Sequence, residues 1–185
     1  MGEQHKKHNR REHLNDFHLN VAGEYVYDGA LYACQNDDAK QRRSKRAVWG
    51  MAAILTVAVA AGGCIPAPGM QNCFYVLLPY LGEFLGAASV IWALAKLGTD
   101  WSTVREYNYK KSVAVLPVRT AVTAVFSLLG VVCELIFFFV NDHAGQTFFA
   151  LLYVLLKLTA LLSALVLRAE IMQAEWDKLP KKDNF

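Results

Sequence analysis

Long apolar segments separated by short polar connections dominate the pattern of this chain. Four of them follow one another, at residues 47–65, 73–97, 112–140 and 147–167. A helix rises about 1.5 Å per residue, so about 20 apolar residues cross the ~30 Å of hydrocarbon in a bilayer. The pattern therefore predicts an all-α membrane protein, in which four transmembrane helices run up-down-up-down as a bundle.

The segments divide the chain into three parts. We expect residues 1–46 to form a basic, tyrosine-rich flank, residues 47–167 to form the transmembrane domain, and residues 168–185 to form a helical extension. The helical pattern of the last part continues through Trp176 and stops at Leu179-Pro180. Neither flank is long enough to bury a sizeable core of its own.

Lysine and arginine are distributed asymmetrically around the apolar segments. Nine precede the first segment, four accompany the connection between the second and third, and four follow the last. The connections 66–72 and 141–146 contain none. Because cytoplasmic loops accumulate basic residues, this pattern predicts that both termini are cytoplasmic. Compact loops without an Asn-x-Ser/Thr acceptor favour a bacterial plasma membrane.

Ionisable residues inside the apolar segments are the strongest candidates for a site: Glu83, Arg119, Glu134 and Lys157. Charged groups at such depth usually face the bundle interior and pair with one another. Glu83 lies nine residues after Phe74, and Lys157 lies nine residues after Phe148, in segments that run in the same direction. Both are thus expected at one depth, near the middle of the membrane.

The other two ionisable residues lie at different depths. Glu134 is six residues before Val140, so its side chain is expected to reach the same layer, whereas Arg119 is near enough to the cytoplasmic end to extend towards lipid headgroups. Two interpretations remain open. The Glu83–Lys157 pair fixes the helix register, or two acids compete for one lysine at a proton- or ion-coupled site.

The first outer connection carries a cysteine at each end, Cys64 and Cys73. We predict a structural disulfide between them, because two antiparallel helix ends joined by a short turn lie close together. Free thiols at a helix end and a redox-active pair are the alternatives, but the eight intervening residues do not match Cys-x-x-Cys. Cys34 and Cys133 are expected to be unpaired.

Small and bulky residues are unevenly shared among the segments. The first is rich in glycine and alanine, so we expect it to be the one most enclosed by its neighbours or by a second copy. Gly82-x-x-x-Gly86 in the second indicates close helix packing. The bulkier third and fourth segments are expected to form the more lipid-exposed half, and Pro117 is expected in the first turn of a helix.

The N-terminal flank offers two weaker signals. Asp28-Gly29, between the β-prone residues of 24–32, indicates either a hairpin or a plain loop. The spacing of four histidines matches no zinc pattern, and we expect no metal site. These residues are His5, His8, His13 and His18.

Composition adds little that is specific to function. The net charge of +3 comes from the flanks, and the basic run 40–46 is suited to anionic lipids rather than to nucleic acid. Since no catalytic or cofactor motif is present, we expect no cofactor and no enzyme activity. The favoured function is a non-enzymatic subunit of a membrane complex, or a self-associating one. The alternative is a small oligomeric transporter or channel, and a membrane thiol oxidoreductase is the least favoured.

Overall fold

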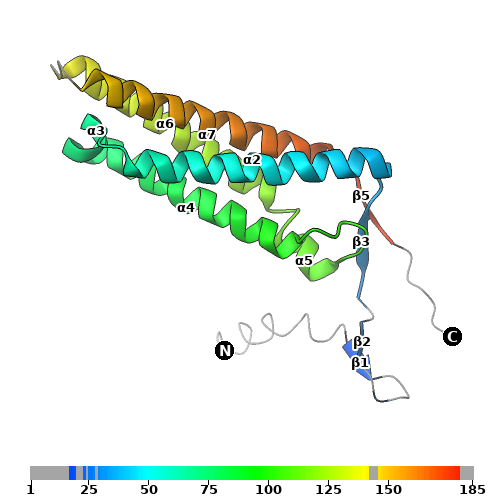
Figure 1. The fold of residues 1–185 in the computed structure, drawn as a ribbon. Coiled ribbons are helices and arrows are strands. Elements are labelled where there is room, and N and C mark those ends of the chain that lie inside the picture. Colours follow the sequence, from blue (N-terminus) through cyan, green and yellow to red (C-terminus); the bar gives the residue numbers. More distant parts are fainter. Residues whose placement is uncertain (1–16, 20–22, 24, 28, 142–145, 180–185) are drawn as a thin grey trace, which may run out of the picture.

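The computed structural model describes residues 17–19, 23, 25–27, 29–141 and 146–179 of the chain. The described part is mostly helical, and four long helices lie beside one another in a bundle (Figure 1). They are α2 (Asp38–Cys64), α4 (Phe74–Leu97), α6 (Leu116–Val140) and α7 (Thr147–Gln173). Each is long and apolar enough to span a membrane. The prediction of four apolar helices of membrane-spanning length is confirmed.

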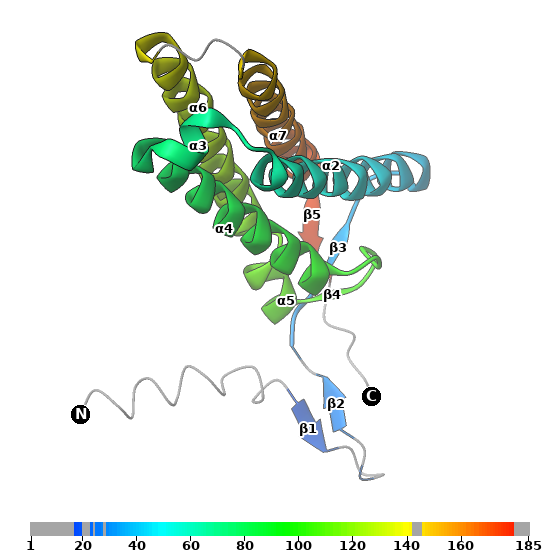
Figure 2. The same cartoon turned by 60° about the vertical axis from the view of Figure 1, so that its left-hand side comes forward.

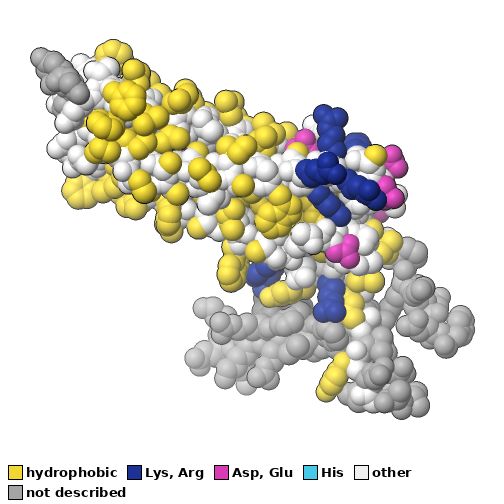
Figure 3. Space-filling view, viewed as in Figure 1, with side chains coloured by type: hydrophobic (Ala, Val, Ile, Leu, Met, Phe, Trp, Pro, Cys, Tyr) yellow, Lys and Arg dark blue, Asp and Glu magenta, His cyan; other side chains and the backbone are white. Residues whose placement is uncertain are grey.

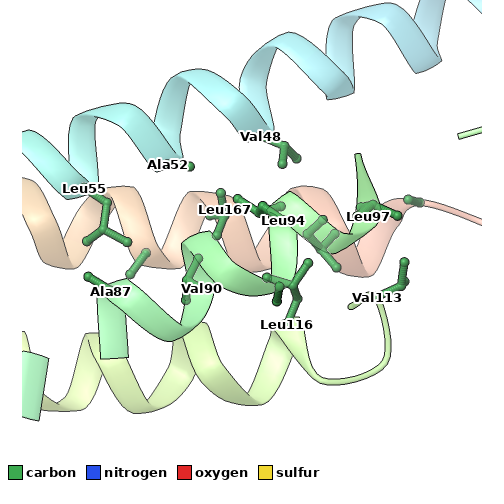
Figure 4. Packing of buried hydrophobic residues seen from close by; sticks show 14 of the residues in the cluster. Val48, Ala52, Leu55, Ala87, Val90, Leu94, Leu97, Val113, Leu116 and Leu167 are labelled. Atoms are coloured by element: carbon green, nitrogen blue, oxygen red, sulfur yellow. The ribbon is translucent and has the colours of Figure 1, made fainter. Parts of the chain in front are cut away.

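The four helices are not equivalent in the bundle. Helix α6 packs against both α4 and α7, whereas α2 packs chiefly on α7 and less on α4. Apolar side chains from all four fill the interior nearest the start of α2 (Figure 4). Val48 and Leu55 come from α2, and they belong to one cluster with Leu94 of α4, Leu116 of α6 and Leu167 of α7.

The expectation that α6 and α7 form the more exposed half is wrong. Within their most apolar stretches, 39% of the residues of each are buried, compared with 33% for α2 and 28% for α4. The reason is positional, because α6 is packed on both sides and α7 is covered by α6 and α2. The small-residue helix α2 is therefore not the one most enclosed within a single chain.

A three-stranded antiparallel sheet joins distant parts of the chain at one end of the bundle (Figure 2). Strand β3 (Leu31–Cys34) is central and pairs with β4 (Val104–Arg105) and β5 (Trp176–Lys178). A short helix, α5 (Glu106–Lys111), follows β4. The N-terminal flank, the middle connection and the C-terminal segment thus meet at one end. Lysine and arginine side chains gather there, while apolar side chains cover the bundle (Figure 3); we call it the basic end.

Three helix boundaries differ from the sequence-based prediction, and one of them is the start of α6, at Leu116 rather than at residue 112. Helix α2 begins at Asp38 rather than at residue 47, so the basic run 40–46 is helical. Helix α7 ends at Gln173, and the predicted helix through Trp176 is wrong, because Trp176 begins strand β5. Pairing with β3 satisfies the backbone of this segment, and the Trp176 ring lies against Trp101, with 5.7 Å between ring centroids.

The hairpin interpretation at Asp28-Gly29 is also wrong. Strand β2 (Tyr25–Tyr27) pairs with β1 (Phe17–Leu19), whereas β3 belongs to the other sheet. The strands that flank the turn therefore have different partners. Asp28 lies outside the described residues, as do His5, His8 and His13 of the N-terminal flank.

A proline shapes the basic end of α6, and the first outer connection shapes the opposite end of the bundle. Pro117 occupies the first turn of α6, as predicted, where its missing N–H leaves no helical hydrogen bond unmade. The connection after α2 is not a plain loop, since it contains the short helix α3 (Pro68–Asn72). Helix α3 contacts α4, α6 and α7, and it lies over their ends farthest from the sheet (Figure 2).

Candidate functional site

The centre of the bundle contains a buried ion pair between α4 and α7. Lys157 Nζ donates to Oε2 of Glu83. The exposed fractions of these residues are 1% and 0%, so water contributes almost nothing to their solvation. Their equal distances along the chain from Phe74 and Phe148 place them at the same level, and the rotation of α4 and α7 turns them towards each other.

A third helix completes the hydrogen bonding of the carboxylate. Ser127 of α6 donates its hydroxyl to Oε1 of Glu83, with 2.6 Å between the two oxygens. Both carboxylate oxygens therefore have a donor. Such satisfaction matters because a buried charge without a partner costs several kcal/mol, on the order of 3–5 when one member of a pair is removed.

Two tyrosine rings surround the ammonium group of Lys157. Its Nζ lies 4.5 Å from the ring centroid of Tyr80 and 4.9 Å from that of Tyr153. The negative faces of aromatic rings attract cations at such distances. Tyr80 precedes Glu83 by three residues and Tyr153 precedes Lys157 by four, so each shares a helix face with its charged neighbour. The sequence analysis missed both tyrosines, because helical spacing places them near a charged residue but does not show which way their rings face.

Glycines bring the remaining backbone close to the lysine. A Cβ atom on Gly62 of α2 would lie 3.9 Å from Lys157 Nζ, and one on Gly130 of α6 would lie 3.5 Å from Lys157 Cδ. All four long helices therefore border the Lys157 side chain. The ion pair is the place where the whole bundle converges.

Close approach of α4 and α6 positions Ser127. A Cβ atom on Gly86 would lie 2.6 Å from Oγ1 of Thr123 and 3.3 Å from its Cα. One on Gly82 would lie 2.5 Å from the ring of Phe126. The glycines thus leave room for α6 side chains where a larger residue would push the helices apart. The close packing predicted from Gly82-x-x-x-Gly86 is present.

Glu134 is buried but lies apart from the ion pair. It follows Ser127 by seven residues on α6, which separates the two by about 10 Å along the helix axis. Its Oε1 accepts a long hydrogen bond from the backbone N–H of Gly69 in α3, at 3.4 Å. Its Oε2 has no hydrogen-bond partner among the described residues. The structure therefore does not place Glu134 in competition for Lys157.

The Tyr153 hydroxyl is a second buried polar group without a partner in the described part of the chain. The residue is fully buried. It lies one helical turn from Lys157, on the side away from the basic end. Unpartnered buried polar atoms are few in native proteins. Among the described residues, this hydroxyl and Glu134 Oε2 lie in the half of the bundle farther from the basic end, and the indole nitrogens of Trp101 and Trp176 are the others, at the basic end.

Arg119 makes a separate contact. Its Nη1 donates to the backbone carbonyl oxygen of Ser89 in α4, at 2.6 Å. It lies about two turns nearer the basic end than Ser127 and does not reach Glu83 or Lys157 by any hydrogen bond or ion pair among the described residues. The four ionisable residues predicted as one network thus occupy three places: the ion pair, the α3 contact and the α4 backbone.

The predicted disulfide is not formed. Cys64 ends α2 and is exposed, while Cys73 caps the start of α4 and is half-buried, and both are free thiols. Helix α3 occupies the connection between them, so α2 and α4 are not joined by the simple turn that the prediction assumed. Cys34 and Cys133 are also free. The described residues contain no group of three or more potential metal ligands.

Comparisons with protein-family models, with curated protein sequences and with solved structures found no match. Function is therefore inferred from the geometry of the bundle. The Glu83–Lys157–Ser127 cluster has partners for its charged atoms and joins three helices. The far half, with Glu134 and Tyr153, retains unused hydrogen-bonding capacity.

Proposed function

We propose that this chain is a non-enzymatic membrane subunit, which acts by associating with other membrane-spanning chains or with a second copy. The proposal rests on one observation, which is that the Glu83–Lys157 pair is buried and hydrogen-bonded within the chain. Each charge already has a protein partner, and the exposed fractions of the two residues are 0% and 1%. A group that binds a transported ion must release such partners in every cycle, whereas a structural pair keeps them.

The exposed side of α2 supports association as the means of action. Gly50, Ala53 and Ala60 are exposed on one side of this helix, where the larger Ile54 and Val57 are exposed beside them. Between membrane helices there is no hydrophobic driving force, so association depends on close backbone approach, which small residues permit. The sequence predicted that α2 is enclosed either by its own neighbours or by a second copy. Because its own neighbours leave this side exposed, a further chain is the remaining way to cover it.

Orientation and location form part of the proposal. We place the basic end in the cytoplasm of a bacterial plasma membrane, because cytoplasmic segments accumulate lysine and arginine. Both termini then lie on that side. The exposed Arg42, Arg43 and Arg46 of α2 would face anionic headgroups there, and Tyr25, which is exposed, belongs to the surface offered to a partner.

Purification in a mild detergent at native expression level tests the proposal. We expect a partner at fixed stoichiometry, or a defined oligomer of this chain. Replacing Ala53→Phe and Ala60→Phe together should abolish that association. Leu151→Phe is the matched control, since Leu151 is also exposed but lies on α7. Purified chain that stays monomeric and partner-free, or association that survives the double substitution, would contradict the proposal.

A second candidate function, proton-coupled transport, is favoured by one observation. Glu134 Oε2 and the Tyr153 hydroxyl are buried without partners in the described part of the chain. Carboxyl and hydroxyl groups in this state bind a proton or ion more readily than saturated groups do. Chain reconstituted alone in liposomes, tested for proton flux with and without Glu134→Gln, decides the matter. Flux that disappears in this variant would replace the subunit proposal.

A further inference from the structure

A groove runs along the lipid-facing side of α6 near the basic end of the bundle. Its volume is about 470 Å³. Val118, Val122 and Val125 of α6 line it, together with Phe126, and Arg168 of α7 closes one side. The three valines are exposed. They extend about 10 Å along the helix axis.

Arg168 is the one charged residue among the side chains that line the groove. It is half-buried, and no hydrogen bond or ion pair ties it to another residue in the described part of the chain. Its guanidinium group has five N–H donors in a planar fork that matches a phosphate or carboxylate. An arginine held in this way against an apolar wall has donors ready for an anion.

The position of Arg168 limits where that anion lies. Helix α7 ends at Gln173, five residues farther on, so Arg168 is about 7–8 Å from the end of the helix. Pro117, which also borders the groove, lies in the first turn of α6. The guanidinium group of Arg168 is thus near the depth at which the bundle emerges from the hydrocarbon. The three valines extend from Arg168 towards the membrane centre.

We propose that this groove binds an anionic glycerophospholipid, with the phosphate on Arg168 and one acyl chain along Val118, Val122 and Val125. Basic pockets beside membrane helices are a recurrent mode of binding for such headgroups. Charge complementarity favours an anionic lipid over a zwitterionic one, because lysine and arginine gather at this end of the bundle (Figure 3).

A second membrane helix fits this groove less well than a lipid does. Valine, phenylalanine and proline make up most of the apolar wall and Ala121 is its one small residue, whereas helix contacts in membranes favour small residues. An apolar helix would also cover Arg168 without offering it an acceptor, which is costly for a charged group. A phosphate supplies the acceptor oxygens. The site does not depend on the proposed partner surface, which lies on α2.

Native mass spectrometry of the full chain in mild detergent tests the proposal. The probes are phosphatidylglycerol, phosphatidylcholine and inorganic phosphate at equal concentration. We expect one phosphatidylglycerol per chain, bound more strongly than phosphatidylcholine. Arg168→Gln should weaken it by about tenfold or more, because charge-assisted hydrogen bonds are lost. Val122→Phe, which fills the groove and keeps the charge, should weaken it similarly.

Matched controls are Lys178→Gln and Val132→Phe, at an exposed lysine of β5 and an exposed valine of α6 that does not line the groove. Both should leave phosphatidylglycerol binding unchanged, and thermal unfolding of each variant reports whether it folds. Equal lipid binding by Arg168→Gln, equal binding of inorganic phosphate, or a dimer in place of the lipid adduct would overturn the proposal.

Discussion

Glu83 and Lys157 stand 74 residues apart in the chain and form a buried ion pair at the point where all four long helices converge. Ser127 from a third helix donates a hydrogen bond to the other oxygen of the Glu83 carboxylate, and two tyrosine rings flank the ammonium group of Lys157. Removing one charge leaves the other buried without a counterion, whereas removing both leaves no unpaired charge in the bundle. This asymmetry makes the pair the most informative place for substitution.

Lys157→Met alone should destabilise the bundle by about 3–5 kcal/mol, because Glu83 loses its counterion. The double variant with Glu83→Gln should recover most of that loss. Lys96→Met, at a partly exposed lysine near the end of α4, is the control and should change stability little. Unfolding free energies of the four members of this double-mutant cycle provide the measurement. Additive effects would show that the two charges do not interact.

Gly69 permits α3 to lie against Glu134. A Cβ atom there would run into the Glu134 carboxylate, 3.0 Å from Cδ, and would lie 3.1 Å from Val76 Cγ2. Gly69→Ala should therefore destabilise the protein by about 1–3 kcal/mol, as overpacking does. Adding Glu134→Ala should relieve part of this cost. Thermal unfolding checks both.

Gly50→Ala is the matched control for Gly69→Ala, since nothing lies within 4 Å of a Cβ atom at Gly50. This substitution in the middle of α2 should stabilise the helix by about 0.5–1 kcal/mol. If the two alanine variants behaved alike, close approach of α3 to Glu134 would be excluded as the cause.

Trp176 of β5 packs against two other aromatic rings and so stabilises the sheet at the basic end. Its ring centroid lies 5.7 Å from that of Trp101 and 5.8 Å from that of Tyr109. Trp176→Ala should release β5 from β3 and leave the helices intact, because the ion pair is elsewhere and Trp176 packs against the edge of the apolar core without being one of its buried members. Hydrogen exchange should rise in 31–34 and 176–178 but not in α4 or α6. Trp92→Ala, at an exposed tryptophan of α4, should leave these strands protected.

Asp100, in the connection after α4, provides a pH-dependent prediction. The hydroxyl and the backbone N–H of Ser102 donate to its carboxylate, at 2.6 and 3.0 Å, and they hold the pKa of Asp100 below its ordinary value. A lowered folded-state pKa contributes stability above the ordinary aspartate range, about 4, and this contribution is lost as the pH falls through the folded-state pKa. The effect is small because the group is exposed.

Ser102→Ala should therefore raise the pKa of Asp100 towards its ordinary value, since it removes the stronger of the two donors. An NMR titration of the Asp100 carboxyl measures this directly. Thr103→Ala, at the next exposed residue, is the control and should not shift the titration. An unchanged pKa in Ser102→Ala would mean that the hydroxyl does not hold the carboxylate in solution.

Residue patterns predicted the spanning helices, the first-turn position of Pro117 and the shared depth of Glu83 and Lys157. Each follows from counting along a helix whose rise per residue is constant. The partners of the pair were harder to find. Ser127, Tyr80 and Tyr153 are ordinary residues in a membrane helix, and nothing in a single sequence distinguishes a tyrosine beside a lysine from one that faces lipid.

The sheet at the basic end and the position of Glu134 were missed for different reasons. Strands of two to four residues are too short to show an alternating pattern, and β3 pairs with segments more than 70 residues away. The connection after α2 was expected to be a turn closed by Cys64 and Cys73. It instead forms α3, whose Gly69 contacts Glu134.

The amino-acid sequence by itself determined how far along the bundle axis each residue lies, because hydrophobic length and helical rise set depth. It also determined that the basic residues gather at one end. Only the tertiary structure decided which faces of the helices meet, since rotation about a helix axis depends on how side chains of several helices fit together. That rotation pairs Lys157 with Glu83, leaves Glu134 beneath α3, and turns Arg168 towards the groove along α6.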